Sequence, residues 1–215
     1  MKTNKDIKRS IAVIILAAGA SRRMGQPKQL LPYKGQALLN YITKCAIASL
    51  GNSVIVILGA NSEKIEPEIA SLPIKIIKNN HWHEGISSSL RCGISYLQKQ
   101  DFPPDGVVFL TCDQPFVSDE LLEQLIDAYY STNKPIIASK YGDTLGITCF
   151  CFSHYFFFPA LMKLQGDRGA KKIINKYPDF SICNRFFLKA TLILDTLENY
   201  QHFIKGLPDH KLSTS

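Results

Sequence analysis

The sequence lacks any long apolar run, and none of its hydrophobic stretches reaches the roughly 20 residues that a membrane-spanning helix needs. It has one tryptophan and no basic run interleaved with aromatic residues, which is the usual pattern of a nucleic-acid-binding segment. The formal net charge is +7, but the first ten residues alone carry four bases against one acid. We therefore expect neither a membrane nor a nucleic acid as partner. The moderately basic remainder suits an enzyme that binds small anions.

The sequence also lacks a C-x-x-C pair, although it contains six cysteines. Cys149 and Cys151 lie in an apolar, strand-like run, where alternation places both side chains on one face. This arrangement favours buried free thiols over a metal site, and scattered reduced thiols are typical of cytosolic proteins. A cytoplasmic location is the expectation.

Two familiar nucleotide-binding motifs and one familiar catalytic motif are absent. A P-loop needs four residues between its glycines and then a lysine, whereas Gly19 and Gly25 have five residues between them and Gln26 follows. G-x-G-x-x-G and G-x-S-x-G do not occur, and no histidine is plainly paired with a cysteine. These absences disfavour P-loop and Rossmann nucleotide binding, and they disfavour catalysis through a protein nucleophile.

The most informative segment covers residues 11–31. An apolar run at 11–17 ends in a loop with two glycines and the cations Arg22, Arg23 and Lys28. Small residues let backbone N–H groups approach phosphate oxygens, and fixed cations neutralise their charge. Two simpler readings compete. One is a secretory signal, disfavoured by the short run and the arginines after it. The other is a plain buried strand and turn.

Strand-like and helical patterns alternate along the first 140 residues, which predicts a mainly parallel sheet with helices on both sides. Strand-like runs cover residues 54–58, 74–77, 107–110, 135–138, 147–152 and 192–194, and helical spacing covers 37–50, 62–70, 86–97, 119–130, 155–164 and 170–176. We expect one domain over residues 1–215, with loose ends at 1–9 and 208–215. Ligands of such sheets gather beyond the carboxyl ends of the strands. That rule brings together the loops at 18–28, 79–85 and 111–115.

Two aspartates follow strand-like runs. Asp113 comes directly after the run at 107–110 and is followed closely by Pro115, and Asp195 stands at the end of the run at 192–194. Mg²⁺ prefers one or two carboxylates together with phosphate oxygens. The pair is therefore a candidate Mg²⁺ site, whereas each aspartate alone fits equally a turn or a helix cap.

Two polar loops complete the candidate site. The loop that contains Asn80 invites a metal interpretation through His81-x-His83, but a pocket wall for a nucleobase or an acceptor is favoured because no third ligand stands at useful spacing. Ser89 belongs to a run of three serines that opens the next helix and offers hydroxyls to a base or sugar. The turn Gly166-Asp167-Arg168-Gly169 is either a helix link or an acceptor-side loop.

Five motifs together resemble the molybdenum-cofactor nucleotidyltransferase family, over roughly residues 13–200. They read LAAGASRRMGQPKQLL (16–31), GISSSLRCG (85–93), CDQP (112–115), GDRGAKKII (166–174) and LDTLENY (194–200). LAAG in place of LAGG is similar to the branch that transfers CMP from CTP to molybdopterin and releases pyrophosphate. The resemblance implies a three-layer α/β/α fold of the nucleotide-diphospho-sugar transferase type, with a Rossmann-like, mainly parallel sheet.

The resemblance also implies roles for individual residues. Arg23 and Lys28 would contact the phosphates and, with Asp113, carry the catalysis, while Asp113 and Asp195 would hold Mg²⁺. The nucleotide would contact Leu16, Ala17, Ala18, Gly19, Arg22, Asn80 and Ser89, and the acceptor would contact Gly166, Asp167, Arg168 and Gly169. A molybdenum hydroxylase or dehydrogenase that receives the product would be a transient partner.

The second half departs from the family pattern. Ile193, Leu197 and Asn199 stand where the late motif usually has aspartate, proline and aspartate. Three alternatives therefore stay open. They are transfer to another phosphorylated alcohol or sugar such as methylerythritol phosphate, use of GTP in place of CTP, and a non-catalytic chaperone that inserts the molybdenum cofactor.

Overall fold

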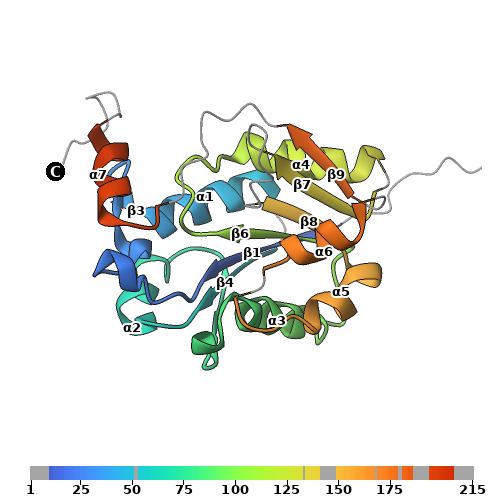
Figure 1. Ribbon diagram of the computed structural model, residues 1–215, viewed down its shortest axis with the longest axis horizontal. Coiled ribbons are helices and arrows are strands. Elements are labelled where there is room, and N and C mark those ends of the chain that lie inside the picture. The colour runs from blue at the N-terminus through green and yellow to red at the C-terminus, as the bar shows by residue number, and fades with distance from the viewer. Residues whose placement is uncertain are drawn as a thin grey trace, which may run out of the picture.

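The computed structural model describes residues 10–50, 53–132, 134–140, 149–167, 169–178, 181–185 and 194–205. The expected loose ends at 1–9 and 208–215 lie outside them. A seven-stranded sheet forms the middle layer, with helices on both faces (Figure 1). The strand order is β5 (Lys75–Lys78), β4 (Ser53–Leu58), β1 (Ile11–Ala17), β6 (Gly106–Thr111), β8 (Cys149–Ser153), β7 (Ile136–Lys140) and β9 (Ser181–Arg185).

The sheet is mainly parallel, as the alternation of elements predicts. Strands β5, β4, β1 and β6 pair in parallel, and β7 pairs in parallel with β9. Strand β8 runs antiparallel to both β6 and β7. A mainly parallel sheet needs helical crossovers that cover its faces, which explains the continuous apolar runs in its strands.

Strand β1 is an interior strand between β4 and β6, and all seven of its residues are buried. Alternate side chains point to opposite faces. Ile11, Val13, Ile15 and Ala17 join the core under helices α1 (Leu38–Leu50) and α4 (Asp119–Thr132). The other side chains join the second core, which packs against α3 (Ile86–Leu97), α5 (His154–Met162) and α6 (Lys171–Lys176). Figure 1 shows α1 and α4 on one face and α3 and α5 on the other.

Helix α3 approaches β1 closely because Gly93 faces the strand. A Cβ at Gly93 would lie 2.8 Å from Cδ1 of Ile14. The close packing of helix on strand fixes the N-terminus of α3 relative to the carboxyl end of β1. Both of these ends border the site described below.

Several boundaries differ from those predicted. Helix α1 begins at Leu38, because the small hairpin of β2 (Pro32–Tyr33) and β3 (Gln36–Ala37) precedes it. Helix α2 (Ser62–Ile65) gives way to a 3-10 turn that contains Pro67, since proline cannot donate within a helix. Strand β9 was not predicted.

Two predicted elements lie partly outside the described residues. Of the strand predicted at 192–194, the structure describes only Leu194, which is buried and not part of a strand. Residues 147 and 148 of the strand predicted at 147–152 also lie outside, and β8 covers the remainder. Helix α7 (Leu197–Lys205) follows Asp195.

Within the described part of the chain, no helix has the length and apolar character needed to cross a membrane.

Candidate nucleotide site

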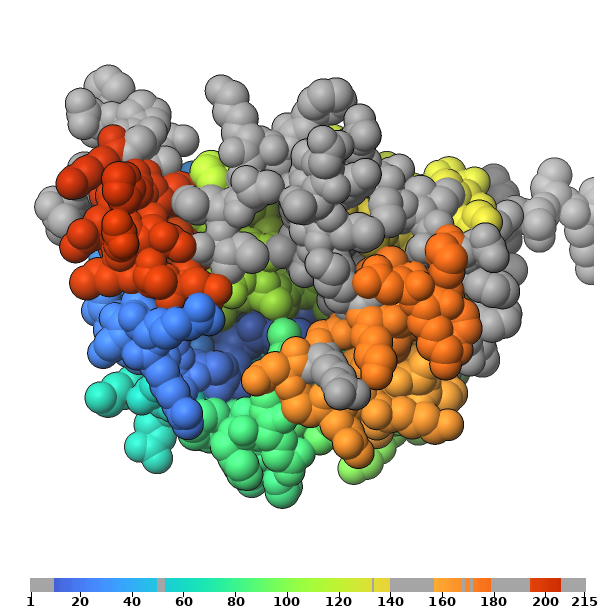
Figure 2. Space-filling view, viewed as in Figure 1, coloured from blue at the N-terminus to red at the C-terminus, as the bar shows by residue number. Residues whose placement is uncertain are grey.

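A cleft of about 530 Å³ opens beyond the carboxyl ends of β1 and β6. In Figure 2 it is the hollow between the blue N-terminal part, the green part around α3 and the orange part around α5 and α6. This is the edge at which the parallel-sheet rule expects ligands. The lining residues are Leu16, Ala18, Gly19, Ala20, Ser21, Arg22, Arg23, Lys28, Gln29, Trp82, His83, Gly85, Ile86, Ser89, Thr111, Cys112, Asp113, Asp167 and Asp195.

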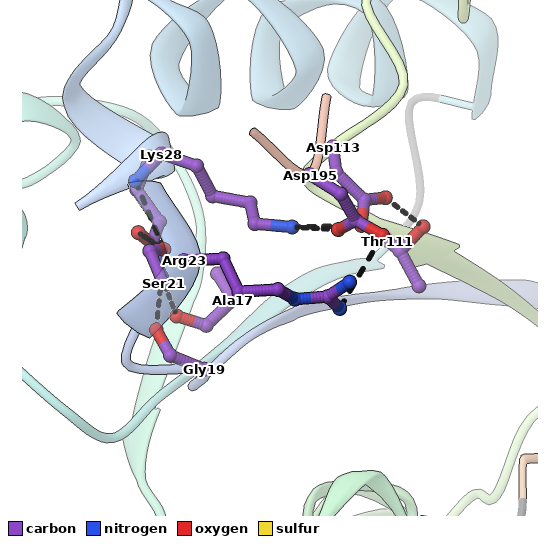
Figure 3. Close-up of polar contacts among 9 residues, drawn as sticks. Ala17, Gly19, Ser21, Arg23, Lys28, Thr111, Asp113 and Asp195 are labelled. Atoms are coloured by element: carbon purple, nitrogen blue, oxygen red, sulfur yellow. Dashed lines mark hydrogen bonds and ion pairs between the residues drawn. The ribbon is translucent and has the colours of Figure 1, made fainter. Parts of the chain in front are cut away.

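The loop after β1 forms one wall of the cleft and is held from below by Gln29. The Gln29 side chain is fully buried, and its amide donates to the carbonyls of Ala17 (2.7 Å) and Gly19 (3.0 Å). The backbone N–H of Lys28 donates to Oγ of Ser21 (3.0 Å), which closes the loop on itself. These contacts, drawn in Figure 3, fix the backbone that the sequence assigns to phosphate binding.

Lys28 lies between two carboxylates. Its Nζ donates to Oδ2 of Asp113 at 3.1 Å and to Oδ1 of Asp195 at 2.9 Å. Thr111 donates to the other oxygen of Asp113 at 2.6 Å, and the Arg23 guanidinium lies 3.7 Å from Asp195. Figure 3 shows these side chains converging from three parts of the chain. Arg23, Lys28, Asp113 and Asp195 were predicted from the sequence as site residues, whereas Thr111 was not, and the structure brings these five side chains together.

The segment that carries Asp195 is held next to Asp113 by a backbone hydrogen bond. The N–H of Leu194 donates to the carbonyl of Asp113 at 3.0 Å. Thr196 then caps helix α7, because its Oγ1 accepts from the N–H of Asn199 at 3.2 Å. Phe203 packs against the ring of Tyr33, which ties α7 to the hairpin beside the first loop. Helix α7 is thereby held against the hairpin of β2 and β3.

The ion pairs shift the pKa values of Lys28 and Asp195. Burial alone lowers the pKa of Lys28, but the charge of Asp113 and the hydrogen bond to Asp195 outweigh it and raise that pKa. Burial alone raises the pKa of Asp195, but the hydrogen bond and charge of Lys28, with the charge of Arg23, lower it. The lysine is therefore cationic and Asp195 anionic at neutral pH.

Cys112 lies next to Asp113 on the cleft wall. Burial and the charge of Asp113 raise the pKa of its thiol to about 12. The thiol is neutral at physiological pH and therefore a poor nucleophile. This agrees with the absence of a nucleophile motif. Cys45 and Cys92 are also free, as expected, and the side chains of the other cysteines lie outside the described residues.

The donor set fits a divalent cation. The carboxylates of Asp113 and Asp195 face one position, which the Lys28 ammonium fills, and Thr111 orients Asp113 by donating to its other oxygen. Among the described residues no cluster of three or more His, Cys, Asp or Glu side chains could complete a protein-only site. Mg²⁺ and Mn²⁺ are commonly held by one or two carboxylates with phosphate oxygens of a substrate. The residues therefore fit a cation that arrives with a phosphate ligand.

The opposite wall is built around Gly85. This residue has φ +94° and ψ −179°, and a Cβ there would lie 2.5 Å from Oδ1 of Asp167. The carbonyl of Gly166 accepts from the N–H of Ser87 at 3.1 Å. Arg91 braces the same region by donating to the carbonyl of Leu164 and to Glu84. The turn at residues 166–167 is thus held against the start of α3.

Behind this wall, Asn79 orients two of the three serines. It is buried, and its amide donates to Oγ of Ser88 (2.8 Å) and to Oγ of Ser89 (3.1 Å). Ser88 donates onward to the carbonyl of Gly85. Since the Ser89 oxygen accepts from Asn79, its proton can be donated to a ligand in the cleft. The sequence placed Asn79 in the loop predicted to form a pocket wall, but it did not identify Asn79 as the residue that orients the serines.

Most of the predicted site residues line this cleft, but some do not. Ala17 is buried beneath the loop and contributes its carbonyl to Gln29. Asn80 is exposed and borders a separate depression. Gly166 and Gly169 are not among the lining residues, and Arg168 lies outside the described part of the chain. Of the predicted acceptor turn, Asp167 reaches the cleft.

A mainly parallel α/β sheet, with a cationic loop and paired carboxylates at its carboxyl edge, defines an α/β protein that handles nucleotide phosphates. Residues 13–180 match the family of the MobA-like NTP transferase domain, and the chain belongs to this family. The predicted enzyme class, a nucleotidyltransferase, is confirmed. Transferases of this family typically depend on a divalent metal.

Two curated relatives illustrate the similarity. Nicotine blue oxidoreductase of Paenarthrobacter nicotinovorans is 29% identical over 53% of this chain and 54% of its own length. The chain thus spans about half the length of that relative. A probable molybdenum cofactor guanylyltransferase of Bacillus cytotoxicus is 25% identical over 64% of this chain and 68% of its own length.

Solved structures confirm the predicted fold type. Rv0371c from Mycobacterium tuberculosis H37Rv superposes with a TM-score of 0.79 and 26% identity, over 92% of this chain and 98% of its own. A second structure of that protein, in complex with manganese, gives a TM-score of 0.74 over 92% of this chain and 100% of its own. The three-layer α/β fold is therefore shared with these proteins and with nucleotidyltransferase structures.

Proposed function

We propose that the chain transfers CMP from CTP to a molybdopterin phosphate and releases pyrophosphate, with Mg²⁺ as the divalent cation that the reaction requires. The observation that carries the proposal is the convergence of Lys28, from the loop after β1, with Asp113 and Asp195 in one cleft. Such a site aligns two phosphates and neutralises them, which is most of what an in-line phosphoryl displacement requires.

The chain's own residues divide the work. The loop at 18–23 holds the triphosphate against backbone N–H groups, while Arg22, Arg23 and Lys28 supply positive charge. Asp113 and Asp195 would hold the metal, which when bound neutralises charge on the α-phosphate and the leaving pyrophosphate. The attacking oxygen belongs to the acceptor, which fits a site whose thiol, Cys112, is neutral. Asp167, on the far wall, contacts the acceptor side.

The choice of base and acceptor rests on similarity and on the loop. LAAG at residues 16–19 resembles the cytidylyl-transferring branch, whereas the Bacillus cytotoxicus relative carries the name guanylyltransferase. GTP is therefore the second candidate. With either CTP or GTP as donor, the nucleotide would be transferred to the same class of acceptor.

The test measures pyrophosphate release by the full chain with Mg²⁺, each of the four nucleoside triphosphates in turn, and molybdopterin. Release with CTP and molybdopterin is the expected result. Release only with GTP would replace the base assignment, and release only with methylerythritol phosphate would replace the acceptor. Nucleotide binding without release for any acceptor would favour the insertion chaperone.

Ala18→Gly is expected to shift the preference from CTP toward GTP. The Ala18 methyl is buried at the cleft wall and packs against Gly59, where a Cβ would lie 2.8 Å from it. Removing the methyl widens the pocket, and a difference of one carbon is worth about 1–3 kcal/mol of discrimination. The ratio of kcat/KM for CTP to that for GTP should fall about tenfold. Ala20→Gly, in the same loop, is the control, and an equal fall there would contradict the role of Ala18.

Asn79→Ala is expected to weaken nucleotide binding and lower stability together. The change leaves the Ser88 and Ser89 hydroxyls and the N–H of His81 without their partner, which costs about 1–3 kcal/mol for a buried group. The Kd for CTP, measured calorimetrically, should rise about tenfold. Asn80→Ala removes the same amide from an exposed position. If Asn80→Ala weakens CTP binding more than Asn79→Ala, the serines are not the base contact.

A further inference from the structure

The Lys28 ammonium occupies the position to which both metal-binding carboxylates point. Its side chain is 14% exposed, and its Nζ lies within hydrogen-bonding distance of Asp113 and Asp195 at once. Figure 3 shows the lysine stem extended from the first loop across to the two aspartates. In this state the chain supplies its own cation to the carboxylate pair.

An ammonium and a divalent cation cannot share this position. The pair of carboxylates needs a positive charge between them, because two like charges at close range repel strongly in a partly buried site. A metal ion that arrives alone must therefore displace Lys28 and leave the ammonium without its two anionic partners. Breaking a partly buried ion pair in this way costs free energy.

A nucleoside triphosphate removes that cost. It brings several negative charges to the loop after β1, from which the Lys28 side chain projects. The Lys28 backbone is fixed by its hydrogen bond to Ser21, while its four-carbon stem can rotate. The ammonium can therefore turn from the carboxylates to the phosphates without rearrangement of the loop, and the carboxylates are then open to a metal.

We propose that Lys28 is an internal cation that holds the metal position until a nucleoside triphosphate draws it away, so that metal and nucleotide bind cooperatively. This inference rests on the proposed nucleotide site, but not on the identity of the acceptor. Because the coupling of two ligands is reciprocal, each should raise the affinity for the other by the same factor.

The experiment follows Mn²⁺ binding to the full chain by the electron paramagnetic resonance signal of free Mn²⁺. It is done with and without a non-transferable α,β-methylene analogue of CTP. Without nucleotide, Lys28→Met should bind Mn²⁺ at least tenfold more tightly than the unchanged chain. With the analogue, the unchanged chain should gain at least tenfold in Mn²⁺ affinity, and Lys28→Met less than threefold. Lys28→Arg keeps the charge and should bind Mn²⁺ as weakly as the unchanged chain.

The matched control is Lys44→Met, the same change at an exposed lysine of α1 that donates to Gln36 and does not line the cleft. It should change Mn²⁺ affinity less than threefold. Mn²⁺ should also raise the Tm of Lys28→Met more than that of the unchanged chain. Lys28→Gln, neutral but still able to donate, serves for both measurements if Lys28→Met does not fold.

The outcomes separate this inference from the proposed function. Equal Mn²⁺ affinity of Lys28→Met and the unchanged chain overturns the internal cation, even if CMP transfer is found. Tighter Mn²⁺ binding by Lys28→Met, without turnover on any acceptor, supports the internal cation and overturns the activity instead.

Discussion

Replacing Asp113 by asparagine is expected to lower kcat for pyrophosphate release by about 10³-fold or more, with the fold retained. The change removes the anionic charge that anchors the cation, whereas the remaining amide oxygen can still accept from one of the two donors, Thr111 or Lys28. Metal-assisted charge neutralisation at a transferring phosphoryl group accounts for several kcal/mol of the barrier, and about 1.4 kcal/mol corresponds to a tenfold change in rate. Mn²⁺ affinity should fall at the same time.

The comparison variant is Asp127→Asn, an equal change on the exposed face of α4. Both variants should give the circular dichroism spectrum of the unchanged chain, and Asp127→Asn should keep its rate. A residual rate of Asp113→Asn above about a tenth would contradict the metal role, because loss of one of two anionic ligands should cost more than that.

Hydrophobic patterns in the sequence predicted the elements whose bounds depend mainly on their own residues. Strand β1 and helix α3 have the predicted bounds, because one is a continuous apolar run and the other keeps its apolar residues on one face. Asp113 was predicted for a similar reason, since a carboxylate directly after a buried strand must lie at the carboxyl edge of the sheet.

Contacts between distant segments were not predictable in the same way. Gln29 is a polar residue in a short helical turn, and nothing in its neighbours shows that its amide holds the carbonyls of Ala17 and Gly19. Asn79 and Asn80 are adjacent and chemically identical. In the fold, Asn79 is buried against the start of α3, whereas Asn80 is exposed. The alternation of side chains along β5, continued past its end, gives only a weak indication of which asparagine is buried.

The position of the Lys28 ammonium was only partly predictable from the sequence. Lys28, Asp113 and Asp195 were each predicted as site residues, but their separations along the chain are 85 and 167 residues. Motif reasoning assigned Lys28 to the phosphates and the aspartates to the metal. The structure pairs them with each other instead, and this pairing is what suggests that metal and nucleotide binding are coupled.

Gly85→Ala is expected to lower the free energy of unfolding by about 3 kcal/mol, which is the largest stability effect we predict for a change this small. With φ at +94° and ψ near 180°, the backbone of Gly85 lies in a region that L side chains rarely adopt, which costs about 1–3 kcal/mol. The added Cβ would also lie 2.5 Å from Oδ1 of Asp167 and 2.6 Å from the carbonyl carbon of Gly166. The turn at 166–167 must therefore move away from α3, and nucleotide affinity should fall with stability.

Gly35→Ala separates backbone strain from the clash. Gly35 has φ +75° in the turn between β2 and β3, and a Cβ there would have nothing within 4 Å, so the cost should be limited to about 1–2 kcal/mol. Chemical denaturation of both variants gives the difference. Asp167→Ala should restore part of the stability lost in Gly85→Ala, because it removes one of the two clashing groups and leaves the Gly166 backbone in place. If Gly85→Ala costs no more than Gly35→Ala, the turn does not rest on the start of α3, and Asp167 is free to take another position in the cleft.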